Sequence, residues 1–148
     1  MDARTSACFV LVPLDDPGRI AGFYTLSAAE ISASVLPGPL TKRLPRYPEV
    51  PVTLLGRLAR DEAFRGQGIG DRLMGDALAR ALAGSAEVGS IGVITDPKDD
   101  RAARFYAEFG FQPATGGRLF LPMTEIVPLA LTQHALRSSL PHHHQQAA

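Results

Sequence analysis

The stretch that decides the fold is "FRGQGIG", Phe64–Gly70, which holds three glycines and lies between two apolar segments. The segment before it, "VTLLGRLA" (Val52–Ala59), is short, mostly apolar and β-compatible, as expected for a strand buried near the middle of a sheet. The segment after it has helical periodicity. Because the free N–H groups of a helix start point beyond the carboxyl end of the preceding strand, this stretch is either a tight turn or an anion-binding loop.

The helix that follows has an apolar face and a polar face. Its apolar residues recur at spacings of three and four, and the pattern predicts an end near Gly84. Asp71, Arg72, Asp76 and Arg80 fall on the opposite face, which we expect to meet solvent. The apolar face comprises Ile69, Leu73, Ala77, Leu78, Ala81 and Leu82.

The remaining predicted elements begin with consecutive strands, after which strands and helices alternate. A hairpin is predicted first, then a proline-rich loop over Ala28–Pro51 that carries Lys42, Arg43 and Arg46. A second helix is capped by Asp99 or Asp100 and stopped by Gly110, and Gly56 predicts a bulge or a close backbone approach. The further predicted elements are strands Phe9–Leu14, Arg19–Ser27, Ser90–Thr95 and Arg118–Met123 and helix Arg101–Phe109. This order predicts an α/β fold.

Length and composition indicate one domain. The chain has 148 residues and 45% hydrophobic content, which suits a single domain over residues 1–131 that folds alone or as a simple oligomer such as a homodimer. Residues 132–148 are polar, with no core to join, and are expected to be disordered. The net charge is zero, no apolar run approaches a membrane span, and the single Cys8 fits a reducing compartment. We therefore expect a cytoplasmic protein.

Two common phosphate loops do not match the glycine stretch. A P-loop has Lys and then Ser or Thr after its last glycine, whereas Asp71 and Arg72 follow Gly70. The dinucleotide fingerprint is G-x-G-x-x-G, and this loop reads G-x-G-x-G. Neither a P-loop nucleoside triphosphatase nor a nicotinamide enzyme is indicated.

A third pattern does match. Arg65, Gly68 and Gly70 fit R/Q-x-x-G-x-G/A, and "DDRAARFYAEFGF" (Asp99–Phe111) fits N-x-x-A-x-x-F/L-Y-x-x-x-G-F with Asp99 in place of asparagine. The chain resembles the GNAT N-acetyltransferase superfamily over Val52–Met123. The resemblance implies a mixed, mostly antiparallel central sheet flanked by helices, with a splayed central strand pair.

The resemblance also implies a donor and its site. Acetyl-CoA would be the acyl donor, and an amine would attack its thioester directly in a ternary complex. Tyr106 matches the tyrosine that often protonates the departing thiolate. The pyrophosphate would bind the loop and the pantetheine the strand end; the expected acetyl-CoA-binding residues are Leu58, Ala59, Arg60, Arg65, Gly66, Gln67, Gly68, Ile69, Gly70, Asp99 and Phe105.

The sequence offers no obvious general base or metal site. All four histidines, His134 and His142–His144, lie in the carboxyl tail, so a histidine base or histidine metal site in the domain is not expected. The central strand carries Arg57 and no carboxylate, although Glu49 and Glu62 flank it and could act through water. Because an α-amine has a pKa of about 7.7–8.0 and a lysine amine about 10.4, the missing base favours an α-amine acceptor.

Three functions follow from these observations. The first is acetyl transfer to a small-molecule or peptide α-amine. The second is suggested by a closer resemblance, since the chain looks like the branch of acetyltransferase toxins that acetylate the α-amine of aminoacyl-tRNA and are neutralised by a ribbon-helix-helix antitoxin. Lys42, Arg43, Arg46 and Arg57 would then form either a tRNA-facing patch or a solvated surface. The third is a CoA-binding regulatory protein without catalysis.

Overall fold

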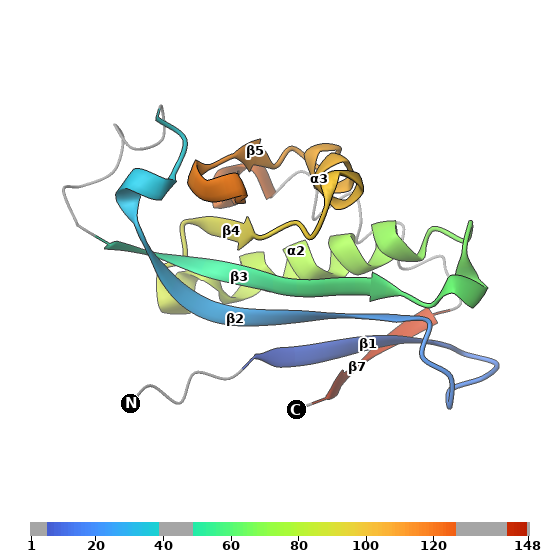
Figure 1. Cartoon of the computed structure of the whole chain (residues 1–148). Helices are drawn as coiled ribbons and strands as arrows, with labels where there is room; N and C mark the ends of the chain where they lie inside the picture. Colours follow the sequence, from blue (N-terminus) through green and yellow to red (C-terminus); the bar gives the residue numbers. More distant parts are fainter. Residues whose placement is uncertain (1–5, 39–48, 127–141, 148) are drawn as a thin grey trace.

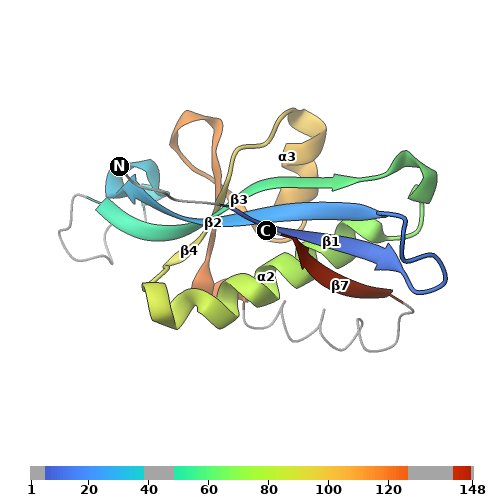
Figure 2. The same ribbon diagram turned by 90° about the horizontal axis from the view of Figure 1, so that it is seen from below.

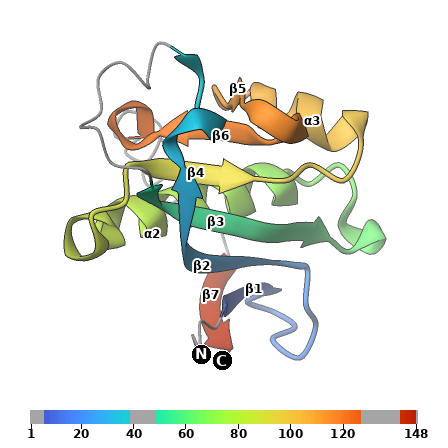
Figure 3. The same ribbon diagram turned by 60° about the vertical axis from the view of Figure 1, so that its left-hand side comes forward.

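The computed structural model describes residues 6–38 and 49–126, and the backbone of residues 142–147. Its described strands form one mixed sheet in the order β5-β6-β4-β3-β2-β1-β7 (Figure 3). The strands are β1 (Ala7–Pro13), β2 (Gly22–Ser32), β3 (Glu49–Arg60), β4 (Gly92–Thr95), β5 (Gln112–Pro113), β6 (Leu119–Pro122) and β7 (His142–Ala147). The helices are α2 (Ile69–Val88) and α3 (Asp100–Ala107), with short 3₁₀ turns η1 (Ala33–Val35), η2 (Glu62–Phe64) and η3 (Thr115–Gly117).

The central strand pair diverges, as the resemblance implied. β3 and β4 are the parallel pair among the described strands, and the pairing covers Thr53–Leu55 with Val93–Thr95. β3 then continues to Arg60, with β2 on its other side as far as Gly22. The last residues of β3 therefore have one edge with no strand partner among the described residues (Figure 1), and this end of β3 lines a cleft together with the start of α3. The prediction of a mixed, mostly antiparallel sheet with a splayed central pair is confirmed.

A bulge accompanies this divergence. The β2–β3 register changes between Thr25, which pairs with Arg57, and Leu26, which pairs with Leu55, so Gly56 is the extra residue. A Cβ at Gly56 would lie 2.8 Å from Thr25 Oγ1, and that hydroxyl accepts a hydrogen bond from Arg57 N–H at 3.0 Å. The prediction of a bulge with a close backbone approach at Gly56 is confirmed.

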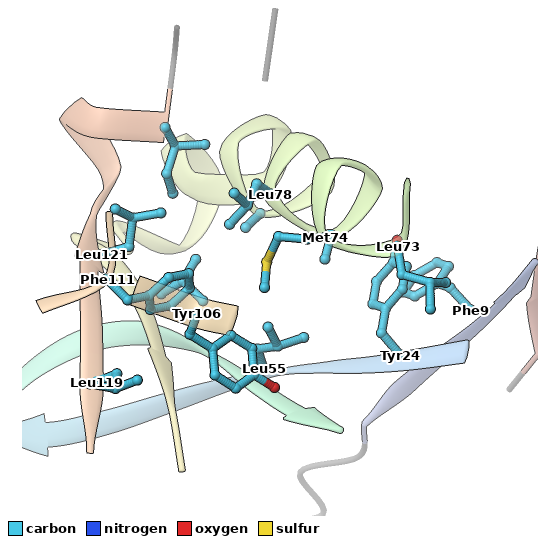
Figure 4. Close-up of a cluster of buried hydrophobic side chains, with 14 of the residues drawn as sticks. Phe9, Tyr24, Leu55, Leu73, Met74, Leu78, Tyr106, Phe111, Leu119 and Leu121 are labelled. Carbon is cyan, nitrogen blue, oxygen red and sulfur yellow. The ribbon is translucent and has the colours of Figure 1, made fainter. Parts of the chain in front are cut away.

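Helix α2 lies along one face of the sheet (Figure 2). Leu73, Met74 and Leu78 are buried there against Leu55 of β3 and Leu121 of β6. Tyr106 of α3 and Phe111 belong to the same cluster, so both helices share one core (Figure 4). The side chains that alternate onto the other face form a second cluster of Ile31, Leu36, Val50, Val52, Ile94 and Phe120.

The predicted boundaries of β2, β3 and α2 are wrong. β2 extends to Ser32 and β3 begins at Glu49, inside the segment expected to be a loop, because Ile31 and Val50 pair there and are buried together. Pro51 is accommodated in β3, and its carbonyl accepts from Ile91 N–H at 3.0 Å. Helix α2 passes Gly84 and ends at Val88, where Gly89 has φ 67° and caps the helix. Lys42, Arg43 and Arg46 lie outside the described residues.

Two further predictions differ from the structure. Arg72 and Asp76, expected on the solvent face of α2, are both buried. For Asp76 the reason is that Tyr24 and Arg80 give its carboxylate polar partners inside the protein. The tail was expected to be disordered, but residues 142–147 form strand β7, antiparallel to β1. The reason is that β1 would otherwise present an open sheet edge, which backbone pairing satisfies without a hydrophobic core. Residues 132–141 lie outside the described residues, and no helix in the described parts has the length and hydropathy of a membrane span.

Candidate active site

A cleft of about 350 Å³ lies where β3 projects beyond β4. Three elements form it: the end of β3 with the turn after it, the start of α2, and the first turns of α3. Its lining residues are Leu58, Ala59, Arg60, Glu62, Gly70, Lys98, Asp99, Arg101, Ala102, Phe105 and Tyr106. The divergence of two neighbouring strands thus creates the space, and the two helices close its sides.

The glycine loop beside this cleft has left-handed backbone at two positions. Gly66 and Gly68 have φ angles of 78° and 73°, which residues with a Cβ rarely adopt. Gly68 is the N-cap of α2 and supplies no side-chain acceptor. Because the first N–H groups of an α-helix have no intrahelical acceptor, those of the first turn of α2 remain available as donors. The helix dipole adds partial positive charge at the same point, which favours an anion.

Gly70 lies where the glycine loop meets α3. A Cβ at this position would lie 3.4 Å from Phe105 Cζ, at the close limit of ordinary van der Waals contact. The first turn of α2 therefore packs closely against the α3 aromatic residue. Phe105 in turn packs against Phe109, with ring centroids 5.3 Å apart in an edge-to-face arrangement.

Helix α3 begins and ends with local sequence signals. Asp99 is the N-cap, and its Oδ1 accepts a hydrogen bond from Ala102 N–H at 2.8 Å. After the helix, Gly110 has φ 98°, and Phe111 turns back so that its ring lies 5.5 Å from that of Tyr106. The predicted cap and the predicted glycine stop are both confirmed. They fix the orientation of α3, and therefore the position of Tyr106.

Tyr106 is buried in the hydrophobic cluster (Figure 4) and also lines the cleft. Burial raises the pKa of its phenol, and hydrogen bonding with the Thr95 side chain acts in the opposite direction. Thr95 is itself buried at the end of β4, and its hydroxyl donates to Leu55 O at 2.9 Å. The phenol therefore stays protonated at neutral pH, at the point where the two central strands separate.

Charged side chains surround the mouth of the cleft. Glu62 lies between two arginines: its Oε2 is 3.4 Å from Nη2 of Arg60, and its Oε1 is 3.9 Å from Nε of Arg65. Lys98 and Arg101 lie on the α3 side. The described carboxylates of the cleft are those of Glu62 and Asp99, and Glu49 lies at the opposite end of β3.

The structure brings most of the predicted site residues together. Leu58, Ala59, Arg60, Gly70, Asp99, Phe105 and Tyr106 line the cleft itself. Arg65, Gly66, Gln67 and Gly68 form the exposed loop beside it, whereas the side chain of Ile69 is buried in the core and only its backbone can take part.

Sequence reasoning named Glu62 only as a possible base acting through water, and it did not assign Lys98, Arg101 or Ala102 to the site. Lys98, Arg101 and Ala102 flank the predicted cap Asp99, so their nearness to the helix start was the signal that could have found them. No group of three or more potential metal ligands occurs in the parts of the chain that the structure describes.

The chain belongs to the acetyltransferase (GNAT) domain family, whose model matches residues 6–113. Among curated proteins it is similar to a "tRNA-acetylating toxin" of Mycobacterium tuberculosis, with 34% identity over 107 residues that cover 72% of this chain and 61% of that protein. It is also similar to "Probable toxin TacT" of Sinorhizobium fredii, with 31% identity over 76% of this chain and 67% of that protein.

Solved structures agree with this assignment. A tyrosine-to-phenylalanine mutant of KacT has a TM-score of 0.70 and 31% identity, covering 75% of this chain and 67% of that one. AtaT in complex with acetyl-methionyl-tRNAfMet has a TM-score of 0.68 and 32% identity, covering 74% and 66%. AtaTR bound with acetyl-CoA has a TM-score of 0.62 and 32% identity, covering 74% and 66%. The chain therefore spans about two thirds of the length of these relatives.

Proposed function

We propose that the protein transfers an acetyl group from acetyl-CoA to a primary amine, with an α-amine preferred, by direct attack in a ternary complex. The observation that carries this proposal is the projection of β3 past β4, which opens a cleft between an anion-binding helix start and a buried tyrosine. The free backbone edge at Leu58–Arg60 can pair with the extended pantetheine amides as an added strand would. The reaction would take place in the cytoplasm, as the reduced state expected of Cys8 also suggests.

The donor would be held from its phosphate end to its thioester. The diphosphate would rest on the N–H groups of Gly66–Gly70, with Arg65 adding a formal charge at the loop. The pantetheine would run between β3 and α3, past Asp99 and Phe105, toward Tyr106. These assignments use backbone donors for the most part, which explains why glycines occupy the loop.

The acyl transfer replaces the C–S bond of the thioester by a C–N bond. The neutral amine nitrogen attacks the thioester carbonyl carbon, a C–N bond forms, and the C–S bond breaks as its electron pair leaves with sulfur. Tyr106 is placed to give its phenolic proton to that thiolate, and the proton that the new amide nitrogen loses passes to solvent or back to the phenolate. Burial keeps the phenol protonated until this step.

The preference for an α-amine acceptor follows from the arrangement of the carboxylates that line the cleft. The Oδ1 atom of Asp99 caps α3, and Glu62 faces two arginines, so neither carboxylate is arranged as a base for an ammonium ion. An α-amine is already partly neutral near pH 7.5 and does not need one, unlike a lysine amine. The ester of an aminoacyl group withdraws electrons and favours the neutral amine further.

Turnover with a panel of acceptors tests this proposal. Purified protein would be given acetyl-CoA and, in separate reactions, free amino acids, amino acid esters, a lysine ε-amine peptide and aminoacyl-tRNA, with CoA thiol release and product mass as readouts. Acetylated product with any α-amine supports the proposal. Acetyl-CoA binding without transfer to any acceptor would instead indicate a non-catalytic CoA-binding protein.

A second candidate acceptor is favoured by a specific observation. The two curated relatives named above are described as a tRNA-acetylating toxin and a probable toxin, and AtaT was solved with acetyl-methionyl-tRNAfMet. In this chain Lys98, Arg101 and Arg60 line the cleft, and Arg57 is exposed on the neighbouring part of β3, which suits a polyanionic acceptor. We infer that aminoacyl-tRNA is the α-amine substrate to test first, with an antitoxin protein as the corresponding partner.

Two results would separate this candidate from a small-molecule acceptor. A tRNA acceptor predicts that the rate with aminoacyl-tRNA falls steeply as salt rises from 50 to 200 mM, because phosphate contacts release counterions. A matched amino acid methyl ester should show little salt dependence. Growth arrest on induced expression, relieved by Tyr106→Phe, is expected for a toxin and would not occur for an enzyme of small-molecule metabolism.

A further inference from the structure

The turn between β3 and α2 places a carboxylate where the donor phosphates are expected. Glu62 is the first residue of η2, the three-residue turn that connects the end of β3 to the glycine loop (Figure 1). Arg60 ends β3 and Arg65 is the C-cap of η2, so the turn brings both arginines to the same carboxylate. Each oxygen of Glu62 faces a different guanidinium, at 3.4 Å for Arg60 and 3.9 Å for Arg65.

The acidic side chain that precedes Glu62 has a structural role. Asp61 Oδ1 accepts from Ala63 N–H at 2.9 Å and caps η2, and its Oδ2 lies 3.9 Å from Arg19. Glu62 makes no cap, and its side chain is 77% exposed, so it can leave the arginines at little cost. Among the described residues, the contacts of the Glu62 carboxylate are those with the two arginines. Glu62 is therefore an anion of the cleft that can move.

We propose that Glu62 is an internal competitor of the diphosphate, which occupies Arg60 and Arg65 in the empty protein and is displaced when acetyl-CoA binds. This inference rests on the proposed function, because it concerns the same donor site. A diphosphate carries more negative charge than one carboxylate and can bind both guanidinium groups together with the loop amides. Binding is then an exchange of anions, so Glu62 lowers the affinity for acetyl-CoA and for the product CoA and speeds CoA release.

The exchange distinguishes Glu62 from a catalytic base. A base acts on the amine and would change kcat, whereas a competitor acts on the diphosphate and changes the dissociation constants of acetyl-CoA and CoA. Glu49, at the other end of the same strand, is exposed and does not line the cleft, which makes it a matched control for the loss of one negative charge.

Calorimetric titration of the Glu62→Gln and Glu49→Gln variants with acetyl-CoA and with S-acetylpantetheine, which lacks the diphosphate, tests the proposal. Glu62→Gln should bind acetyl-CoA about two- to fivefold more tightly than the parent at low salt, the range expected for loss of weak surface pairs. The gain should shrink at 0.5 M salt, where the Debye length falls to about 4 Å. S-acetylpantetheine affinity and the Glu49→Gln variant should show no gain.

Three results would overturn the proposal while leaving the donor assignment intact. They are unchanged acetyl-CoA affinity in Glu62→Gln, an equal gain with S-acetylpantetheine, and a loss of kcat at unchanged affinity, which would make Glu62 the base. If the parent protein binds neither acetyl-CoA nor CoA, the proposed function fails instead. The two failures are thus distinguishable by the parent titration alone.

Discussion

The hydroxyl of Tyr24 on β2 donates a hydrogen bond to the carboxylate of Asp76 on α2, which is 1% exposed. Asp76 also accepts from Arg80 Nε at 3.1 Å, and the Arg80 guanidinium lies 4.2 Å from the centre of the Phe9 ring. Phe9 stacks on Tyr24 with ring centroids 5.2 Å apart (Figure 4). Strands β1 and β2 and helix α2 therefore meet at the Asp76 carboxylate. This cluster holds α2 on the sheet. It thereby positions the first turn of α2, which borders the cleft.

Removing the Asp76 carboxylate should destabilise the fold. Asp76→Ala leaves the Tyr24 hydroxyl unpaired in the core and takes the partner of Arg80 away, and we expect a loss of about 2–4 kcal/mol in unfolding free energy. Asp71→Ala, at an exposed position in the first turn of the same helix, should cost less than about 1 kcal/mol. Urea unfolding of both variants measures the difference; equal effects would mean that the buried cluster adds nothing.

The left-handed backbone at Gly68 should matter for stability and binding together. Gly68→Ala meets no atom within 4 Å but forces a Cβ onto a residue with φ 73°, which should cost about 1 kcal/mol and weaken acetyl-CoA binding by moving the loop amides. Gly84→Ala, also without a neighbour within 4 Å but inside α2, should stabilise by up to about 1 kcal/mol and leave binding unchanged. Urea unfolding and acetyl-CoA titration check both variants, and parent-like affinity in Gly68→Ala would contradict the role of the loop.

The pH dependence of kcat/KM should reflect ionisation of the acceptor amine at lower pH and ionisation of the Tyr106 phenol at higher pH. With an α-amine acceptor, kcat/KM should rise through about pH 7.7–8.0 as the amine becomes neutral. Because burial raises the pKa of Tyr106 above its ordinary value of about 10, the proton donor should persist beyond that pH. Rates measured from pH 6 to 10.5 check both limbs; a decline that begins near pH 8.5 would point to a different acid.

Folding stability should fall at high pH for the same physical reason. Burial and the Asp76 carboxylate raise the pKa of Tyr24, and burial raises that of Tyr106, so both phenols stay protonated in the folded protein above the pH at which the unfolded chain loses these protons. Their contribution is complete below about pH 10 and is lost as pH rises further. Chemical unfolding at pH 8 and pH 10.5 should therefore show a smaller pH-dependent loss in Tyr24→Phe than in the parent.

The local signals of the sequence predicted the framework of the site. The spacing of Arg65, Gly68 and Gly70, the cap at Asp99 and the stop at Gly110 depend on residues close together in the chain, and the structure has the cap and the stop where they were expected. Gly56 marked the bulge for the same reason, since only a residue without Cβ fits beside Thr25.

What the sequence could not predict depends on contacts between distant segments. Asp76 was assigned to solvent because helical periodicity cannot show that Tyr24 approaches it from another strand. The place of Glu62 between two arginines depends on a 3₁₀ turn of three residues, which is too short to leave a periodic pattern. The pairing of residues 142–147 with β1 involves backbone groups at opposite ends of the chain, and these carry no side-chain signal at all.

Single-turnover rates of Tyr106→Phe measure whether Tyr106 delivers the proton in acetyl transfer, as the site geometry predicts. The parent, Tyr106→Phe and the buried-tyrosine control Tyr24→Phe would each be mixed with saturating acetyl-CoA and aminoacyl-tRNA or an amino acid ester. We expect Tyr106→Phe to lose about 10²–10⁴-fold in rate with parent-like acetyl-CoA affinity, while Tyr24→Phe transfers acetyl at the parent rate per folded molecule. Parent-like transfer by Tyr106→Phe would contradict the assignment.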